Sequence, residues 1–232
     1  MNLLTKIGLY VGATFILTIL LAGIQQITGL DPQRLSLPQW GPGIIAIAMV
    51  LTFKQDGVRL NLSVQAAHTP KYLIALALPV TVALLLYLIY SQFIGPIGLP
   101  PFEFPALMLL FGGILLGALG EELGWRGYAQ NLLDRHLAPL VGTLIIGVIW
   151  GVWHVGNFQY GALHMLFFVL GTIGISLFIR WLIEGAQHSV ILATAVHFAI
   201  NAGYYILGDA LTDTRLMILN GIVWLGIGVA VV

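Results

Sequence analysis

Long apolar stretches alternate with short polar connections along most of this 232-residue chain. A helix that crosses the hydrocarbon core of a bilayer needs about 20 mostly apolar residues. By that measure the pattern predicts about eight transmembrane helices, the second of them short because it opens with Gly41-Pro42-Gly43. The predicted segments cover residues 7–27, 41–54, 71–94, 105–133, 138–157, 162–184, 188–207 and 214–232. The fold class expected is therefore all-α, a polytopic membrane helix bundle.

The composition agrees with a membrane protein and excludes several kinds of chemistry. Hydrophobic residues make up 59% of the chain and charged residues only 8%, whereas a soluble domain carries about 25% charged residues. With a formal net charge of zero, the chain has no basic face for nucleic acid. Its apolar composition instead makes membrane lipids the expected partners. The absence of cysteine excludes disulfides, iron–sulfur clusters, thiolate zinc sites and cysteine nucleophiles.

The distribution of Lys and Arg predicts the orientation, because basic loops stay on the cytoplasmic side. If the N-terminus is inside, five basic residues fall in cytoplasmic loops and two fall outside, so both termini should be cytoplasmic. Arg126 and Arg180 lie within helix ends and strengthen the same bias. The five inside are Lys6, Lys54, Arg59, Lys71 and Arg135, and the two outside are Arg34 and Arg215.

The chain shows no linker, low-complexity stretch or clear internal repeat, which predicts one membrane domain over residues 1–232. Small residues recur at helical spacing in two of the predicted helices, as Gly113 with Gly117 and Gly147 with Gly151. Such pairs allow close helix packing in lipid. We therefore expect the fourth and fifth segments to approach each other closely.

Polar and ionisable residues at membrane depth are candidates for function, because placing a charge there costs on the order of 2.5–3.5 kcal/mol. Glu122 and Arg126 stand four residues apart, so they can form an ion pair on one helix face. Glu121 points about 100° away from that face and is left unpaired. Three of the predicted helices contribute to this set, which comprises Glu121, Glu122, Arg126, His154, His197 and Asn201.

Depth along the helices predicts that these groups meet. Glu121 and His154 lie at similar distances, roughly 23–26 Å at 1.5 Å per residue, from the turn between the fourth and fifth segments. They can therefore face each other across the hairpin. His197 and Asn201 are four residues apart and so share one face of the seventh segment.

This set of groups is close to what amide hydrolysis requires without a nucleophilic side chain. A carboxylate and a histidine can hold and deprotonate a water molecule, while a second histidine and an asparagine donate hydrogen bonds to the developing oxyanion. The trio Glu121, His154 and His197 could alternatively bind a divalent metal such as zinc with an open water position. The sequence does not choose between the two.

Three motifs occur in order on successive predicted helices: Glu121-Glu122-x-x-x-Arg126, Trp150-x-x-x-His154 and His197-x-x-x-Asn201. Together they resemble the CPBP family of intramembrane proteases, the group that contains the CAAX-processing endopeptidases and the bacterial Abi proteins. The similarity covers roughly residues 105–205 as a CPBP-like catalytic core. Residues 1–104 carry no motif that assigns them a role.

The resemblance implies roles for the individual residues. The family's catalytic glutamate corresponds to Glu121 and its water-activating histidine to His154. The oxyanion-stabilising pair falls on His197 and Asn201. The family's supporting pair corresponds to Glu122 and Arg126. The aromatic residue four positions before the first histidine, which lines the site and is more often Phe in the family, is Trp150 here.

An intramembrane endopeptidase in a prokaryotic cell membrane is thus the main hypothesis, with a membrane-associated or lipidated peptide or protein as substrate. The resemblance leaves the requirement for a metal open. Two other classes of membrane protein would use the same Glu, His and Asn side chains in a different way. A proton-coupled transporter or channel would use the Glu and His residues as a relay, and a non-catalytic bacteriocin-immunity protein would bind a partner.

Overall fold

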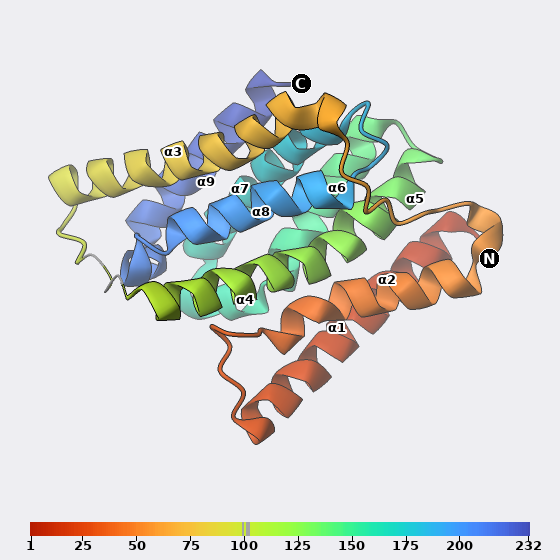
Figure 1. The fold of residues 1–232 in the computed structure, drawn as a ribbon, viewed down its shortest axis with the longest axis horizontal. Coiled ribbons are helices and arrows are strands. Elements are labelled where there is room, and N and C mark those ends of the chain that lie inside the picture. The colour runs from red at the N-terminus through yellow and green to blue at the C-terminus, as the bar shows by residue number, and fades with distance from the viewer. Residues whose placement is uncertain (99, 101–102) are drawn as a thin grey trace.

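The computed structural model describes residues 1–98, 100 and 103–232, and these residues form a bundle of helices (Figure 1). No strand occurs in the described ranges; an isolated bridge joins Asn61 to Ser189. The all-α prediction is therefore confirmed. The α-helices are α1 (Leu3–Thr28), α2 (Gly41–Thr52), α3 (Thr69–Phe93), α4 (Phe104–Glu122), α5 (Asn131–Asp134), α6 (Pro139–Trp153), α7 (Ala162–Ile183), α8 (Val190–Tyr204) and α9 (Thr214–Ala230).

Four helical stretches are long and apolar enough to cross a membrane, namely Leu3–Thr28, Ala66–Phe93, Phe104–Asp134 and Ala162–Ile183. Many large hydrophobic side chains on these helices are exposed, as expected for a surface that faces lipid rather than water. The structure is thus a helical membrane bundle, while the number of spans and the side of the termini stay predictions. The shorter apolar helices are Leu37–Thr52, Pro139–Trp153, Val190–Tyr204 and Thr214–Ala230.

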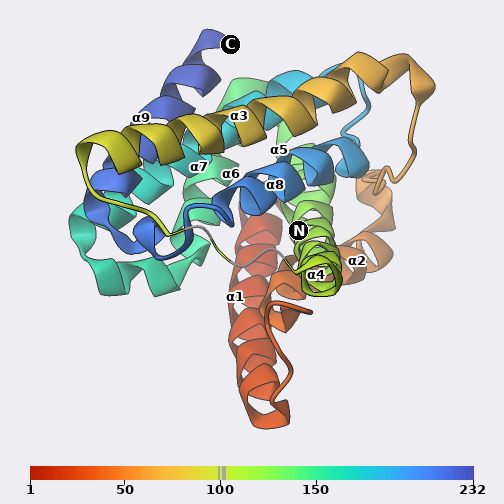
Figure 2. The ribbon, with the colours of Figure 1, turned by 60° about the vertical axis from the view of Figure 1, so that its left-hand side comes forward.

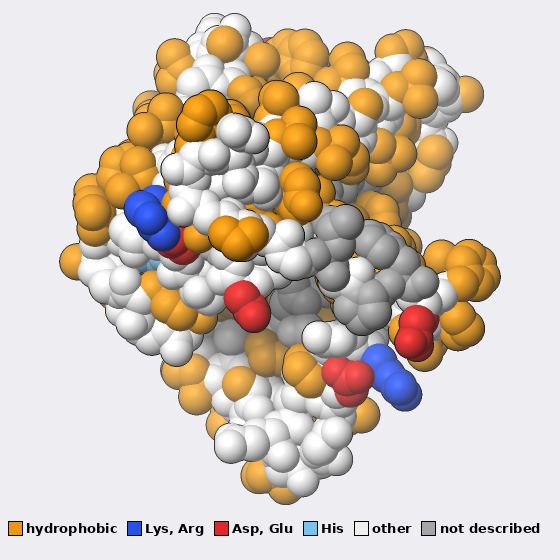
Figure 3. Space-filling model, turned by 90° about the vertical axis from the view of Figure 1, so that its left-hand side faces the viewer, with side chains coloured by type: hydrophobic (Ala, Val, Ile, Leu, Met, Phe, Trp, Pro, Cys, Tyr) orange, Lys and Arg blue, Asp and Glu red, His pale blue; other side chains and the backbone are white. Residues whose placement is uncertain are grey.

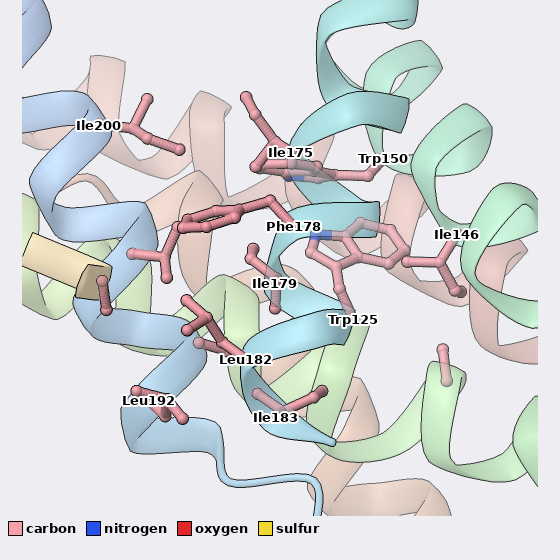
Figure 4. Packing of buried hydrophobic residues seen from close by; sticks show 14 of the residues in the cluster. Trp125, Ile146, Trp150, Ile175, Phe178, Ile179, Leu182, Ile183, Leu192 and Ile200 are labelled. Atoms are coloured by element: carbon pink, nitrogen blue, oxygen red, sulfur yellow. The ribbon is translucent and has the colours of Figure 1, made fainter. Parts of the chain in front are cut away.

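The central packing places α7 against both α6 and α9, and α3 along α8. Aromatic and branched side chains fill the space between these helices; Trp125, Trp150 and Phe178 are buried there (Figure 4). Helix α1 projects from the rest of the bundle (Figure 2) and packs chiefly on α2 and the short 3-10 helix η1 (Leu37–Trp40).

The predicted fourth segment, residues 105–133, is not one regular helix. After α4 the backbone continues as a π-helix, η4 (Leu123–Gln130), and then as α5. All eight residues of η4 are buried. Wide turns of this kind occur frequently at functional sites, and this one begins directly after Glu121 and Glu122.

The glycine pairs do allow close packing, but the predicted partners were wrong. A Cβ at Gly147 would lie 2.8 Å from Ile173 Cα on α7. A Cβ at Gly117 on α4 would collide with the Gln39 side-chain amide. The fifth segment therefore packs against α7, while the fourth leaves room for the residues that precede α2.

Candidate active site

The four residues predicted to be catalytic line one cavity of about 170 Å³. Glu121 comes from the end of α4, His154 from the residue that follows α6, and His197 and Asn201 from α8. Three helices therefore bring one carboxylate, two imidazoles and one carboxamide together, as their depths along the helices predict. The rest of the lining is Gln39, Trp150, Phe168, Gly171, Thr172, Ile175, Ile200, Tyr204 and Asn220.

The Glu121 carboxylate is fully buried and is held by two neutral donors. Gln39 Nε2 donates to Oε1 at 2.8 Å. The indole Nε1 of Trp150 donates to Oε2 at 2.7 Å. Because each oxygen retains a second lone pair, the carboxylate is oriented and can still accept a hydrogen bond from a molecule in the cavity.

His154 is fixed in one tautomer by the end of its own helix. Its Nδ1 lies 2.8 Å from the main-chain oxygen of Trp150, and a carbonyl oxygen only accepts, so Nδ1 carries the proton of this hydrogen bond. The neutral ring then has its lone pair on Nε2. Ring contacts with Trp153 at 4.9 Å and Phe168 at 5.0 Å between centroids restrict the orientation of the imidazole.

Glu122 and Arg126 form the predicted ion pair, with Arg126 NH1 2.8 Å from Glu122 Oε1 and both side chains fully buried. The same oxygen lies 2.9 Å from His197 Nδ1, so the pair also orients the second histidine. The guanidinium is further held by Ser176 Oγ at 2.9 Å. It also lies 4.3 Å from the ring centroid of Trp150, which connects this pair to the residue that holds Glu121.

The donor set does not fit a resident metal ion. Across residues 1–98, 100 and 103–232, no three His, Cys, Asp or Glu side chains are grouped so that they could hold one. Both oxygens of Glu121 accept hydrogen bonds from Gln39 and Trp150.

Gln39 is a residue of the candidate site that the sequence motifs do not reveal. It stands 82 residues before the carboxylate that it contacts, and no motif connects the two positions. The nearest sequence signal is the Gly41-Pro42-Gly43 run, which marks a sharp start for α2 immediately after η1. Thr172, Tyr204 and Asn220 were likewise not singled out, although they line the cavity.

Comparison with known proteins gives matches that cover this site. Residues 103–203 match the family model described as type II CAAX prenyl endopeptidase Rce1-like. The chain is 31% identical over 145 residues to CAAX prenyl protease 2 of Methanococcus maripaludis, covering 58% of this chain and 51% of that protein. It is 25% identical over 225 residues to lysostaphin resistance protein A of Staphylococcus aureus (strain NCTC 8325 / PS 47), covering 92% and 53%.

The chain thus spans about half the length of the curated relatives that it matches. The matched region, residues 103–203, contains all three motifs and all four residues predicted to be catalytic. With its long apolar helices, the chain is an integral membrane protein whose reported relatives are archaeal and bacterial. The comparisons confirm the resemblance of this chain to the CPBP intramembrane proteases, through a region that matches the Rce1-like family.

Proposed function

We propose that this protein is an intramembrane endopeptidase that hydrolyses a peptide bond of a membrane-associated substrate. The observation that carries the proposal is the shared cavity, in which an oriented, unpaired carboxylate faces the same space as two histidines and an asparagine. The match to a CAAX prenyl endopeptidase family supports a peptidase over a transporter or a binding protein.

In the proposed mechanism, Glu121 and His154 activate a water molecule. Glu121 accepts a proton from the water while His154 Nε2, which carries the lone pair, accepts the second hydrogen bond and fixes the direction of attack. The hydroxyl oxygen adds to the carbonyl carbon of the scissile peptide bond. When the tetrahedral intermediate collapses, the carbon–nitrogen bond breaks and the departing amine takes the proton that Glu121 had accepted.

His197 and Asn201 stabilise the oxyanion that forms during this attack. The Asn201 carboxamide supplies neutral N–H donors, and His197 donates from Nε2 when its ring is an imidazolium. Nδ1 of His197 lies 2.9 Å from Glu122 Oε1, and this contact orients the ring for that role.

No step of this mechanism passes through a metal ion, so removal of metal ions should not affect cleavage. We expect exhaustive dialysis against a chelator to leave the rate of peptide cleavage by the purified protein unchanged, because the described residues include no group of three His, Cys, Asp or Glu side chains that could hold a metal ion. The measurement is cleavage of a lipidated peptide, followed by mass spectrometry, before and after chelation. Loss of activity that added zinc restores would contradict the mechanism.

Replacement of His154 tests the proposed function directly. His154→Ala should lower the cleavage rate by on the order of 10²–10⁴-fold, because the lone pair that directs the water is removed. The matched control is His164→Ala on α7. His164 is fully buried but does not line the cavity, so that variant should cleave at nearly the original rate. Unchanged cleavage by a folded His154→Ala protein would refute the proposed function.

A further inference from the structure

The two ends of the helix bundle carry opposite charge. The basic end comprises the first turns of α1, the α2–α3 connection with the first turn of α3, α5 with the turn that follows it, and the last turn of α7 with the loop before α8. It holds six Lys and Arg against three acidic residues. The acidic end holds two Arg against four acidic residues. The basic end thus has Lys6, Lys54, Arg59, Lys71, Arg135 and Arg180 with Asp56, Asp134 and Glu184; the acidic end has Arg34 and Arg215 with Asp31, Glu103, Asp209 and Asp213.

Contacts between distant parts of the chain show that the basic end is one surface. Lys6 at the start of α1 pairs with Asp56 at 2.5 Å. Arg180 near the end of α7 pairs with Asp134 at 2.7 Å. The Arg135 guanidinium donates to the main-chain oxygen of Gly57 at 3.0 Å, which joins the α5–α6 turn to the α2–α3 connection.

Most of the lining of the active-site cavity lies in the half of the bundle next to the acidic end, while His197 lies at the midpoint of α8 and Glu121 near the end of α4. His154 follows the last residue of α6, and Asn201 lies three residues before the end of α8. Phe168 is only six residues from the start of α7, about 9 Å along the helix, and about 22 Å from its basic end at Ile183. Figure 3 shows the acidic end, with Asp and Glu side chains on its surface.

We infer that the active-site cavity faces the extracytoplasmic side of the membrane. Short loops rich in Lys and Arg are retained in the cytoplasm, so the basic end is cytoplasmic and the acidic end is outside. If the protein is the endopeptidase proposed above, its substrate is a membrane-anchored peptide whose scissile bond enters from the outer face. A prenylated chain presented from the cytoplasm would reach the wrong end of the bundle.

Single cysteines test this orientation, because the chain contains none. Gln159 and Gln55 are matched sites: both are exposed, and each lies in a short 3-10 helix, at the acidic and the basic end respectively. In intact cells, a membrane-impermeant maleimide should label Gln159→Cys as fully as in detergent. The same reagent should leave Gln55→Cys unlabelled until the membrane is dissolved.

Labelling of Gln55→Cys in intact cells, or no labelling of Gln159→Cys in them, would overturn the inferred orientation. The same pair is then measured with Glu121→Ala present, so that orientation is read without peptidase activity. Correct labelling together with a wild-type protein that cleaves no peptide would refute the proposed function and leave the orientation standing. A protein that cleaves peptide but labels at Gln55→Cys and not at Gln159→Cys in intact cells would overturn the orientation and leave the proposed function standing.

Discussion

Replacement of Glu121 by glutamine is expected to lower peptide cleavage by on the order of 10²–10⁴-fold, because the amide cannot take a proton from water. The substitution should leave the fold intact. The new carboxamide can accept from Trp150 Nε1 and donate to Gln39, whose own amide can turn to present its oxygen. Both neighbours of the present carboxylate would therefore keep a hydrogen bond.

The matched control for this prediction is Glu184→Gln, which removes an exposed carboxylate at the basic end of the bundle. Its cleavage rate should stay close to that of the unaltered protein. The measurement is the initial rate on one lipidated peptide in detergent, with thermal unfolding recorded for each variant. A Glu121→Gln protein that unfolds normally and still cleaves at the original rate would exclude Glu121 as the general base.

Replacement of Arg126 by leucine is expected to have the largest effect on stability. Arg126 and Glu122 are both fully buried and 2.8 Å apart, so removal of the guanidinium leaves an uncompensated carboxylate in the interior. Loss of one partner of a buried pair costs about 3–5 kcal/mol. The free energy of unfolding, measured in detergent by denaturant titration, should fall by that amount.

Two comparisons isolate the pair from other effects of the substitution. Arg34→Leu breaks an exposed pair with Asp31 and should cost less than about 1 kcal/mol. The double variant Glu122→Gln with Arg126→Leu removes both charges, so it should be more stable than Arg126→Leu alone. If the double variant were as unstable as the sum of its single variants, the ion pair would not be the source of the cost.

Most helix positions could be predicted from the sequence because the apolar stretches have sharp edges. The segment predicted at residues 162–184 is Ala162–Ile183 in the structure. The fifth segment, predicted to reach residue 157, instead ends at Trp153, because His154 leaves the helical conformation with φ −77° and ψ 54°. The seventh begins at Val190 rather than 188, since the Ser189 hydroxyl caps the helix by accepting from Leu192 N–H.

The convergence of Glu121, His154, His197 and Asn201 could be predicted, because helical period and depth depend only on local spacing. Three features could not. The π-helix η4 results from packing that buries every one of its residues. The partners of Gly117 and Gly147 depend on the arrangement of whole helices. Gln39 is connected to Glu121 only by the path of the folded chain.

The contact between Gln39 and Glu121 crosses the boundary of the region that carries the family motifs. The region with family motifs, residues 103–203, contains the carboxylate but not the amide that holds one of its oxygens. Trp153, beside His154, similarly donates to Thr18 Oγ1 on α1 at 3.0 Å. The N-terminal helices are therefore structural components of the candidate active site, and a fragment cut at the motif boundary would lose one of the two side chains that hold Glu121.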